Sequence, residues 1–472
     1  MAEKTLSEFI YGYGKRGAVS FHTPGHKGRS EIFERYGFSD FATGIVAHDI
    51  TEIPGADNLA DPRGRIKELG ERYADLYGAK KTYLSVNGST ACVMASILST
   101  VPRGGKLVMG RNSHISAFNA LRLGGIEPVY VESEIDENTY LDSETRMGKI
   151  AVALDENPDA DAVFITSPNY FGALSDIYEI ARIVREYGKI LIVDQAHGAH
   201  LKFFDYAEKT KTAAENLGAD IVIDSIHKSL LSFTGSSIVN VCSDDVDADL
   251  LAETLVRLQT TSPSYLLLES LDINEIILRK NGKSIIESWR SDLDFFYEEV
   301  TKIPDVRAVK GGKRDDAKIT VSLASLGFSG SKLEKELRSG GIWAEFAHGE
   351  YVTLVTGAGN VRDDYVRLLH KLKEISQSYA ISSKPVERRP LILFGGDLLR
   401  GDVPLQKEKI PLYKAEGRTL YGTITPYPPG IPVACPGEII DTDLLRYIQK
   451  LIANDAFVAG IDEEGMVEVG RD

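Results

Sequence analysis

Lys228 and Asp194 are the residues whose types and spacing most directly suggest a reaction. Lys228 closely follows the apolar segment Asp220–Asp224, and Asp194 ends the apolar segment Lys189–Asp194, 34 residues earlier. A lysine amine can form a Schiff base with an aldehyde, and a carboxylate can pair with a pyridine nitrogen and keep it protonated. A lone lysine after a strand is usually a solvated loop residue. Its combination with an aspartate at a neighbouring strand end instead indicates a pyridoxal phosphate site.

The turn at residues 87–90 (NGST) is the expected site for the cofactor's phosphate. It follows an apolar segment and precedes a helical run, so Ser89 and Thr90 could act only as helix caps. The same position also offers free backbone N–H groups and the positive end of the helix dipole to a phosphate. Ser225 and His227 flank the lysine and could reach the same phosphate.

His114 is a candidate for stacking on the pyridine ring. It follows the apolar segment Lys106–Gly110, where it could also be an ordinary loop histidine with one hydrogen bond. Stacked on the ring, it would exclude solvent from one face of the cofactor. Ala196, two residues beyond Asp194, would present only a methyl group to the opposite face.

Metal binding is the alternative chemistry that the histidines raise. His22 with His26, and His197 with His200, are spaced like pairs of metal ligands. Neither pair fits the helical arrangement of a metalloprotease, so no metal site is expected. The three cysteines form no Cys-x-x-Cys pair, which argues against a zinc site or a disulfide framework. They are Cys92, Cys242 and Cys435.

The elements that must position these residues form an α/β pattern. From about residue 60 to 245, short runs rich in Val, Ile and Leu alternate with amphipathic helical stretches such as Asp176–Tyr187. This alternation predicts a mostly parallel sheet covered on both faces. The expected strands are Thr82–Val86, Lys106–Gly110, Pro128–Val131, Asp161–Thr166, Lys189–Asp194, Asp220–Asp224 and Ser237–Cys242.

The remainder of the chain predicts further units. Residues 247–300 are expected to be largely helical, and residues 303–375 to mix strands (Ile319–Leu323, Tyr351–Val355) with helices (Ser331–Ser339, Asp363–Tyr379). The proline-rich segment Thr425–Gly437 cannot be regular helix or a central strand. The expected division is an N-terminal segment (1–60), a large cofactor-binding domain (61–300), a small α+β domain (301–381) and a C-terminal α+β domain (382–472), with a boundary near Ser382–Pro390.

Composition excludes some classes of function. The 472 residues include 54 Lys and Arg against 69 Asp and Glu, a formal net charge of −15, which argues against general nucleic-acid binding. The sequence has no apolar run long enough to span a membrane and no secretory signal pattern. A cytoplasmic protein without nucleic-acid or membrane partners is therefore expected.

Several segments, in the same order along the chain, resemble the ornithine/lysine/arginine decarboxylases. They are FHTPGHKG (21–28), NGST (87–90), RNSH (111–114), DQAHGAH (194–200), DSIHKSL (224–230), TSPSYLLLESLD (261–272) and PYPPGIPVACPGE (426–438). The resemblance implies a pyridoxal phosphate enzyme of the aspartate-aminotransferase fold. Such an enzyme has a large domain with a mostly parallel sheet, a small α+β domain and a C-terminal α+β domain.

The resemblance also implies a role for each matched residue. Lys228 would bind the cofactor covalently, Asp194 would hold the pyridine nitrogen, His114 would stack on the ring and His197 would lie near the ring hydroxyl. The phosphate would be held by Ser89, Thr90, Ser225 and His227.

The resemblance further implies a homodimer with shared active sites. The segments HTPGHKG (22–28) and TSPSY (261–265) would lie near the dimer interface and complete the partner's site. Large members of the family carry a wing domain before the HTPGHKG motif, which here begins only some twenty residues into the chain. A dimer or small oligomer is therefore expected rather than the wing-linked decamer.

The expected reaction is α-decarboxylation of a basic L-amino acid to an amine of the polyamine pathway, with Lys228 or His114 as the proton donor. Glu345, and secondly Glu438, are candidate acceptors for the substrate's distal cation, although Glu345 could be a solvated strand residue. Arginine, giving agmatine, is favoured. Lysine or ornithine as substrate, an aminotransferase with the same cofactor, and a catalytically silent regulatory paralogue remain the alternatives.

Overall fold

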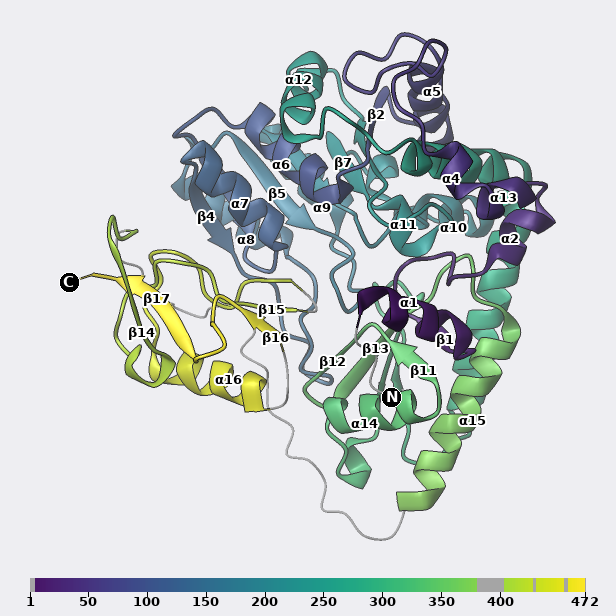
Figure 1. Cartoon of the computed structure of the whole chain (residues 1–472). Coiled ribbons are helices and arrows are strands. Elements are labelled where there is room, and N and C mark those ends of the chain that lie inside the picture. Colours follow the sequence, from purple (N-terminus) through teal and green to yellow (C-terminus); the bar gives the residue numbers. More distant parts are fainter. Residues whose placement is uncertain (1–4, 380–402, 428–429, 454–456, 472) are drawn as a thin grey trace.

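A computed structural model of the chain describes residues 5–379, 403–427, 430–453 and 457–471 (Figure 1). Its central element is a seven-stranded sheet in the order β2-β8-β7-β6-β5-β3-β4. The strands from β7 to β4 are parallel, and β8 runs antiparallel to both of its neighbours, so the mostly parallel sheet is confirmed. The strands are β2 (Lys81–Ser85), β3 (Lys106–Gly110), β4 (Glu127–Val131), β5 (Ala162–Thr166), β6 (Ile190–Asp194), β7 (Ile221–Asp224) and β8 (Ser237–Val241).

Helices cover both faces of this sheet. Successive strand residues point to opposite faces, so each face has its own set of core contacts. Met109 and Phe164 pack in one core cluster with α6, α7 and α12, whereas their neighbours Val108 and Val163 pack in another with α8 and α9. The strands are therefore apolar on both faces, as expected for a buried parallel sheet. The helices are α6 (Gly88–Thr100), α7 (Ile115–Gly124), α8 (Met147–Glu156), α9 (Ile177–Glu186), α10 (Leu201–Glu208), α11 (Ile226–Ser229) and α12 (Ala248–Leu258). We call this sheet and its helices the large domain.

A single helix of 36 residues, α13 (Tyr265–Val300), leads from the large domain into the next unit. There, a four-stranded antiparallel sheet in the order β12-β13-β10-β9 packs with α14 and α15, and we call this unit the small domain. The predicted strands and helices of this region are confirmed to within two residues. The elements are β9 (Arg307–Val309), β10 (Lys318–Ser322), α14 (Gly330–Ser339), β11 (Ile342–Ala344), β12 (Phe346–His348), β13 (Tyr351–Val355) and α15 (Arg362–Tyr379).

The N-terminal segment joins the small domain before it reaches the large one. Strand β1 (Val19–Phe21) pairs in parallel with β11, and the dark purple helix α1 (Leu6–Lys15) lies beside them in Figure 1. The chain then crosses to the large domain. The helices along this path are α2 (Ser30–Arg35), α3 (Ser39–Thr43), α4 (Ile45–His48) and α5 (Arg65–Tyr77).

The C-terminal residues form a separate core around Leu420, Ile424 and Val469. In its described residues the proline-rich segment contributes the short strand β15 to a two-stranded sheet and an isolated bridge at Ala434, which agrees with the prediction that it is neither helix nor central strand. The predicted boundary Ser382–Pro390 lies outside the described residues. We call this unit the C-terminal domain, and its elements are β14 (Lys407–Pro411), β15 (Thr425–Tyr427), α16 (Thr442–Ala453), β16 (Phe457–Ala459) and β17 (Met466–Gly470).

Candidate active site

Lys228 lies in the one-turn helix α11, which starts two residues after β7 ends. Its Nζ is 2.9 Å from Nε2 of His197. Burial lowers the pKa of the Lys228 amine, while the negative charges of Asp194 and Glu345 act in the opposite direction. A lysine whose amine is more readily neutral than usual is suited to attack an aldehyde.

Asp194 ends β6, the strand that pairs with β7. Its side chain is buried, with 4% of the residue exposed, and one carboxylate oxygen accepts the backbone N–H of Ala196 at 3.0 Å. Burial raises the pKa of Asp194, and the nearby Lys228 opposes that rise. The pairing of β6 with β7 therefore brings together the aspartate and the lysine that the sequence predicts as partners.

His197 is buried beside Lys228. Burial, together with the positive charge of Lys228, lowers the pKa of His197 well below its ordinary value, so the ring is neutral and its Nε2 can accept from the lysine amine. The ring packs against Tyr170 with centroids 4.6 Å apart. Its Nδ1 is buried and has no hydrogen-bond partner.

His114 caps the N-terminus of α7, where its Nδ1 accepts the backbone N–H of Ser116 at 3.2 Å. Burial, with a further contribution from Lys228, lowers the pKa of His114 to about 3, so this ring is also neutral. The cap fixes Nδ1 and leaves the ring face and Nε2 for other contacts.

Two of the segments predicted to hold a phosphate contact the neighbouring residues Gly235 and Ser236. Gly88, at the start of α6, donates its N–H to the carbonyl of Gly235 at 2.7 Å, and Nδ1 of His227 donates to the carbonyl of Ser236 at 2.8 Å. The first turn of α6, which contains Ser89 and Thr90, thus lies beside His227.

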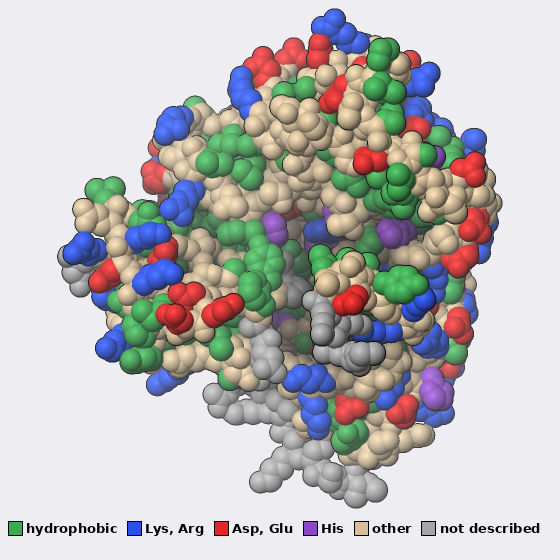
Figure 2. Space-filling view, viewed as in Figure 1, with side chains coloured by type: hydrophobic (Ala, Val, Ile, Leu, Met, Phe, Trp, Pro, Cys, Tyr) green, Lys and Arg blue, Asp and Glu red, His purple; other side chains and the backbone are tan. Residues whose placement is uncertain are grey.

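The donor set fits pyridoxal phosphate. The hydroxyl of Ser225 and Nδ1 of His197 are both buried without a hydrogen-bond partner, as expected for groups that await a ligand. The small side chain of Ala196 is buried next to Asp194 and adds no bulk there. Figure 2 shows histidine and lysine or arginine side chains at the floor of a hollow between the three domains.

Glu345 occupies the break between β11 and β12 rather than the interior of a strand. Its Oε2 accepts the backbone N–H of Thr23, in the HTPGHKG segment, at 2.8 Å. Its charge also raises the pKa of Lys228, which places it within electrostatic reach of the lysine. Glu345 therefore lies at the margin of the site, and the contact with Thr23 uses its Oε2 atom.

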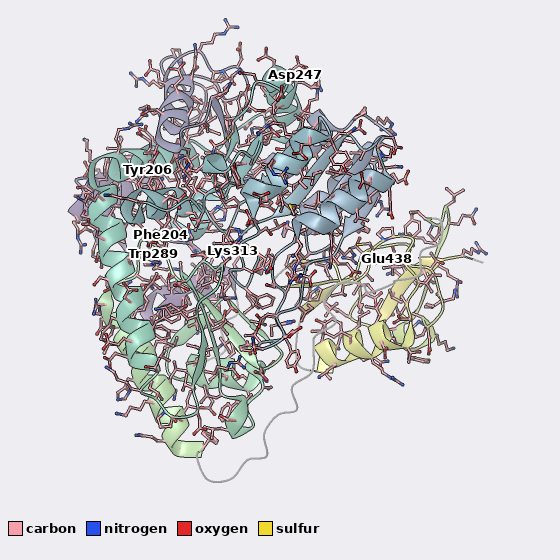
Figure 3. All side chains as sticks on the ribbon, turned by 180° about the vertical axis from the view of Figure 1, so that it is seen from behind. Phe204, Tyr206, Asp247, Trp289, Lys313 and Glu438 are labelled. Atoms are coloured by element: carbon pink, nitrogen blue, oxygen red, sulfur yellow. The ribbon has the colours of Figure 1, made fainter. Side chains whose placement is uncertain are left out.

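Glu438 has a different environment. Its Oε2 accepts from the guanidinium of Arg111 at 3.1 Å and from the backbone N–H of Cys435 at 2.7 Å, and both charged side chains are only 3% exposed. From behind, Figure 3 shows Glu438 at the edge of the C-terminal domain that adjoins the large domain. The predicted role in substrate binding stays untested, and in this structure the carboxylate serves an internal ion pair.

Sequence reasoning did not find Lys318, which starts β10 in the small domain. Its Nζ donates to the carbonyl of His197 at 3.2 Å and lies 3.9 Å from the carboxylate of Asp315. Burial lowers the pKa of Lys318 to about 8. A lysine at the start of an apolar strand usually ends in solvent, so the sequence contains no signal for this contact.

Sequence reasoning also did not assign a role to Lys27 within the HTPGHKG segment. Its Nζ donates to the carbonyls of His22 and Val355, at 2.7 and 3.0 Å, and burial lowers its pKa to about 7. The same segment contacts α11, because the N–H of Gly25 donates to the carbonyl of His227 at 2.7 Å. In this chain the segment therefore adjoins its own lysine.

Two negative findings apply only to the described part of the chain. Within it, no three His, Cys, Asp or Glu side chains are grouped so that they could hold a metal ion. No helix in the same residues combines the length and apolar character needed to cross a membrane.

Comparison with known proteins identifies the family. The sequence model of the Orn/Lys/Arg decarboxylase major domain matches residues 5–310, and that of the C-terminal domain matches residues 400–466. The chain belongs to the Orn/Lys/Arg decarboxylase family. The resemblance found in the motifs is thus confirmed, and the protein is an enzyme of this decarboxylase family.

Family members are similar over nearly the whole chain. An arginine decarboxylase of Bacillus subtilis is 31% identical over 93% of this chain and 91% of its own length, and one of Bacillus anthracis is 30% identical over 95% and 93%. Lysine decarboxylase A of Pseudomonas aeruginosa is similar in structure, with a TM-score of 0.74 and 18% identity over 98% of this chain and 80% of its own. The expected fold class is therefore confirmed.

Proposed function

We propose that this enzyme uses pyridoxal phosphate to decarboxylate L-arginine to agmatine. The observation that supports it most is the convergence of Lys228, Asp194 and His197 at the ends of adjacent strands. Several relatives at about 30% identity are named arginine decarboxylases, whereas an inducible lysine decarboxylase of Escherichia coli is 23% identical over 63% of this chain. This difference favours arginine over lysine.

The chain's own residues would bind and orient the cofactor. When bound, pyridoxal phosphate accepts the electrons that remain at Cα after CO2 departs. Nζ of Lys228 would bind its aldehyde, and the carboxylate of Asp194 would hold a proton on its ring nitrogen. His114 would exclude water from one ring face. The phosphate would be bound by Ser89, Thr90, Ser225 and His227.

Protonation at Cα requires a donor close to the reacting atom. The amine of Lys228 is one candidate, because His197 Nε2 holds it at 2.9 Å and the neutral His197 ring does not compete for its positive charge. His114 is the other candidate, but a pKa of about 3 keeps its ring uncharged at neutral pH, and the N–H of a neutral imidazole is a poor acid. The geometry therefore favours Lys228 as the donor.

Glu345 is the proposed acceptor for the substrate's guanidinium group. A carboxylate can accept two parallel hydrogen bonds from a guanidinium group. An ammonium group interacts with it as a point charge and lacks this paired geometry. In this structure one oxygen already accepts the N–H of Thr23. Binding of arginine would use the remaining acceptor capacity of the same carboxylate.

We also infer a homodimer with shared active sites. The start of α13, where TSPSY (261–265) ends, and the HTPGHKG segment are the regions that would adjoin the partner. Sedimentation of the purified enzyme tests the oligomeric state. Mixing Lys228→Ala subunits with subunits substituted at Ser262, an exposed residue of TSPSY, tests site sharing, because activity can be restored only if the two residues of one site come from different chains.

The central test is a panel of amino acids with CO2 and product mass as readouts. We expect the purified enzyme to bind pyridoxal phosphate with a visible absorption band that Lys228→Ala lacks, and to release CO2 and agmatine from arginine. Oxo acids in place of amines would favour the aminotransferase alternative. Faster turnover of lysine or ornithine would correct the substrate. A protein that binds no cofactor would be a silent paralogue.

A further inference from the structure

A buried ion pair joins the C-terminal domain to the loop that carries His114. Arg111, three residues before His114, donates to Glu438 at 3.1 Å and to the carbonyl of Pro432 at 2.7 Å. These partners lie more than 320 residues away in sequence. A buried charge that loses its partner is strongly destabilising, so Arg111 and Glu438 must stay in contact. This contact fixes the C-terminal segment against the loop that carries His114.

The C-terminal segment 430–438 also packs against the large domain through apolar side chains. Cys435 is 2% exposed and belongs to the core cluster that contains α6 and α7, rather than to the core of its own domain. Ile431 packs in a cluster with Tyr170, the residue whose ring contacts His197. Through Ile431 and Cys435, residues 430–438 thus pack against the large domain.

Gly430 makes the contact that reaches His114 itself. Its carbonyl accepts the N–H of Ile115 at 3.0 Å, and a Cβ built on Gly430 would lie 3.1 Å from Nε2 of His114. The ring of His114 is therefore held on one side by its own helix cap at Nδ1 and on the other by the backbone of Gly430.

We propose that Arg111 and Glu438 are positioning residues through which the C-terminal domain holds the His114 ring against the cofactor site. The physical contact needs no cofactor, whereas its effect on cofactor binding rests on the proposed function. Glu438 then acts on the reaction without contacting the substrate. The ion pair between Arg111 and Glu438 keeps Gly430 in position beside the His114 ring.

The first experiment measures the contact in the cofactor-free protein. Diethyl pyrocarbonate acylates neutral imidazole nitrogens, so the labelling rate of His114 reports access to its Nε2. We expect Glu438→Ala to raise that rate about tenfold, because local opening of the junction exposes the ring. The exposed His370 on α15, quantified by peptide mass spectrometry in the same sample, should keep its rate. An unchanged His114 rate would overturn the proposal.

The second experiment measures whether the pair acts through His114. We expect Glu438→Ala to weaken pyridoxal phosphate binding about tenfold in the wild-type background and less than about twofold in a His114→Asn background. Equal losses in both backgrounds would overturn the proposal. Wild-type protein that binds no pyridoxal phosphate would instead refute the proposed function, and the labelling result would still stand.

Further variants separate positioning from folding. Glu438→Gln keeps an oxygen for Arg111 and Cys435 and should restore most of the lost binding. Arg111→Met combined with Glu438→Leu leaves no unpaired buried charge, so it should fold while His114 stays accessible. Glu408→Ala removes the carboxylate that pairs with Arg418 within the C-terminal domain and should leave both readouts unchanged. Failure of Glu438→Gln to restore binding, or protection of His114 in the double variant, would contradict the proposal.

Discussion

Lys318 shows how a single buried charge links the small domain to the active site. Its Nζ holds the carbonyl of His197, so it defines the backbone from which the His197 ring reaches Lys228. Only 1% of Lys318 is exposed, and its positive charge has Asp315 as the nearest counter-charge. The position of Lys228 therefore depends on a residue from another domain.

The lowered pKa of Lys318 predicts a specific dependence of stability on pH. In the folded protein the amine loses its proton near pH 8, whereas the unfolded chain keeps it to about pH 10.5. Because the unfolded state binds more protons in this window, stability rises with pH from about 8 to 10.5. The gain is at most about 3 kcal/mol.

Urea unfolding of wild-type protein and Lys318→Met at several pH values measures this effect. We expect the unfolding free energy of the wild type to increase relative to that of Lys318→Met as the pH rises from about 8 to 10.5. Parallel curves would mean that the Lys318 amine has an ordinary pKa.

Glu345 carries the prediction about substrate choice. Replacing it with Gln removes a charge-assisted hydrogen bond to guanidinium, so kcat/KM for arginine should fall about 10- to 100-fold. Norvaline, which has no distal cation, should be turned over at the same low rate by both enzymes. Equal losses for arginine and norvaline would show that Glu345 supports the site only through Thr23.

At the scale of elements, α11 is held by two segments from distant parts of the chain. Gly25 donates to the carbonyl of His227 and accepts from Gly359, and Ala358 donates to the carbonyl of Ser229. A Cβ on Gly25 would lie 2.2 Å from the carbonyl oxygen of Leu230, directly after α11. The backbone of Gly25 therefore has to approach α11 without a side chain.

Gly25→Ala should displace the end of α11 and with it Lys228. We expect the affinity for pyridoxal phosphate to fall about tenfold or more, because backbone atoms cannot move aside as a flexible side chain does. Gly14→Ala is the matched control, since a Cβ there, within α1, meets no atom within 4 Å. Comparable losses in both variants would indicate a general effect of changing the N-terminal segment.

The sequence predicts elements well where local pattern decides them. All seven strands of the central sheet and the helices α9, α14 and α15 were predictable, because each is a continuous buried run or has an amphipathic period. Lys228 and Asp194 were predictable as partners because strand ends meet at one edge of a parallel sheet. Pairing across hundreds of residues, as between Arg111 and Glu438, leaves no local signal, so the sequence does not predict this ion pair.

The whole molecule carries a net charge of −15, which attracts a cationic substrate at long range. Salt screens such attraction within about 10 Å at 0.1 M. We expect kcat/KM for arginine to fall by only about twofold between low and physiological salt, because recognition rests on a carboxylate in contact with the substrate. A tenfold fall in stopped-flow or steady-state measurements would show that the overall field dominates.

The contacts around α11 also determine when the site can exist during synthesis. Residues 25, 227–229 and 357–359 must all be present before the helix that carries Lys228 is enclosed. A nascent chain that has emerged only as far as the large domain lacks one side of this enclosure. Because contacts of such long sequence separation form slowly, the active site is among the last parts to assemble. A chain released early from the ribosome would therefore keep much of its sheet and yet have no place for the cofactor.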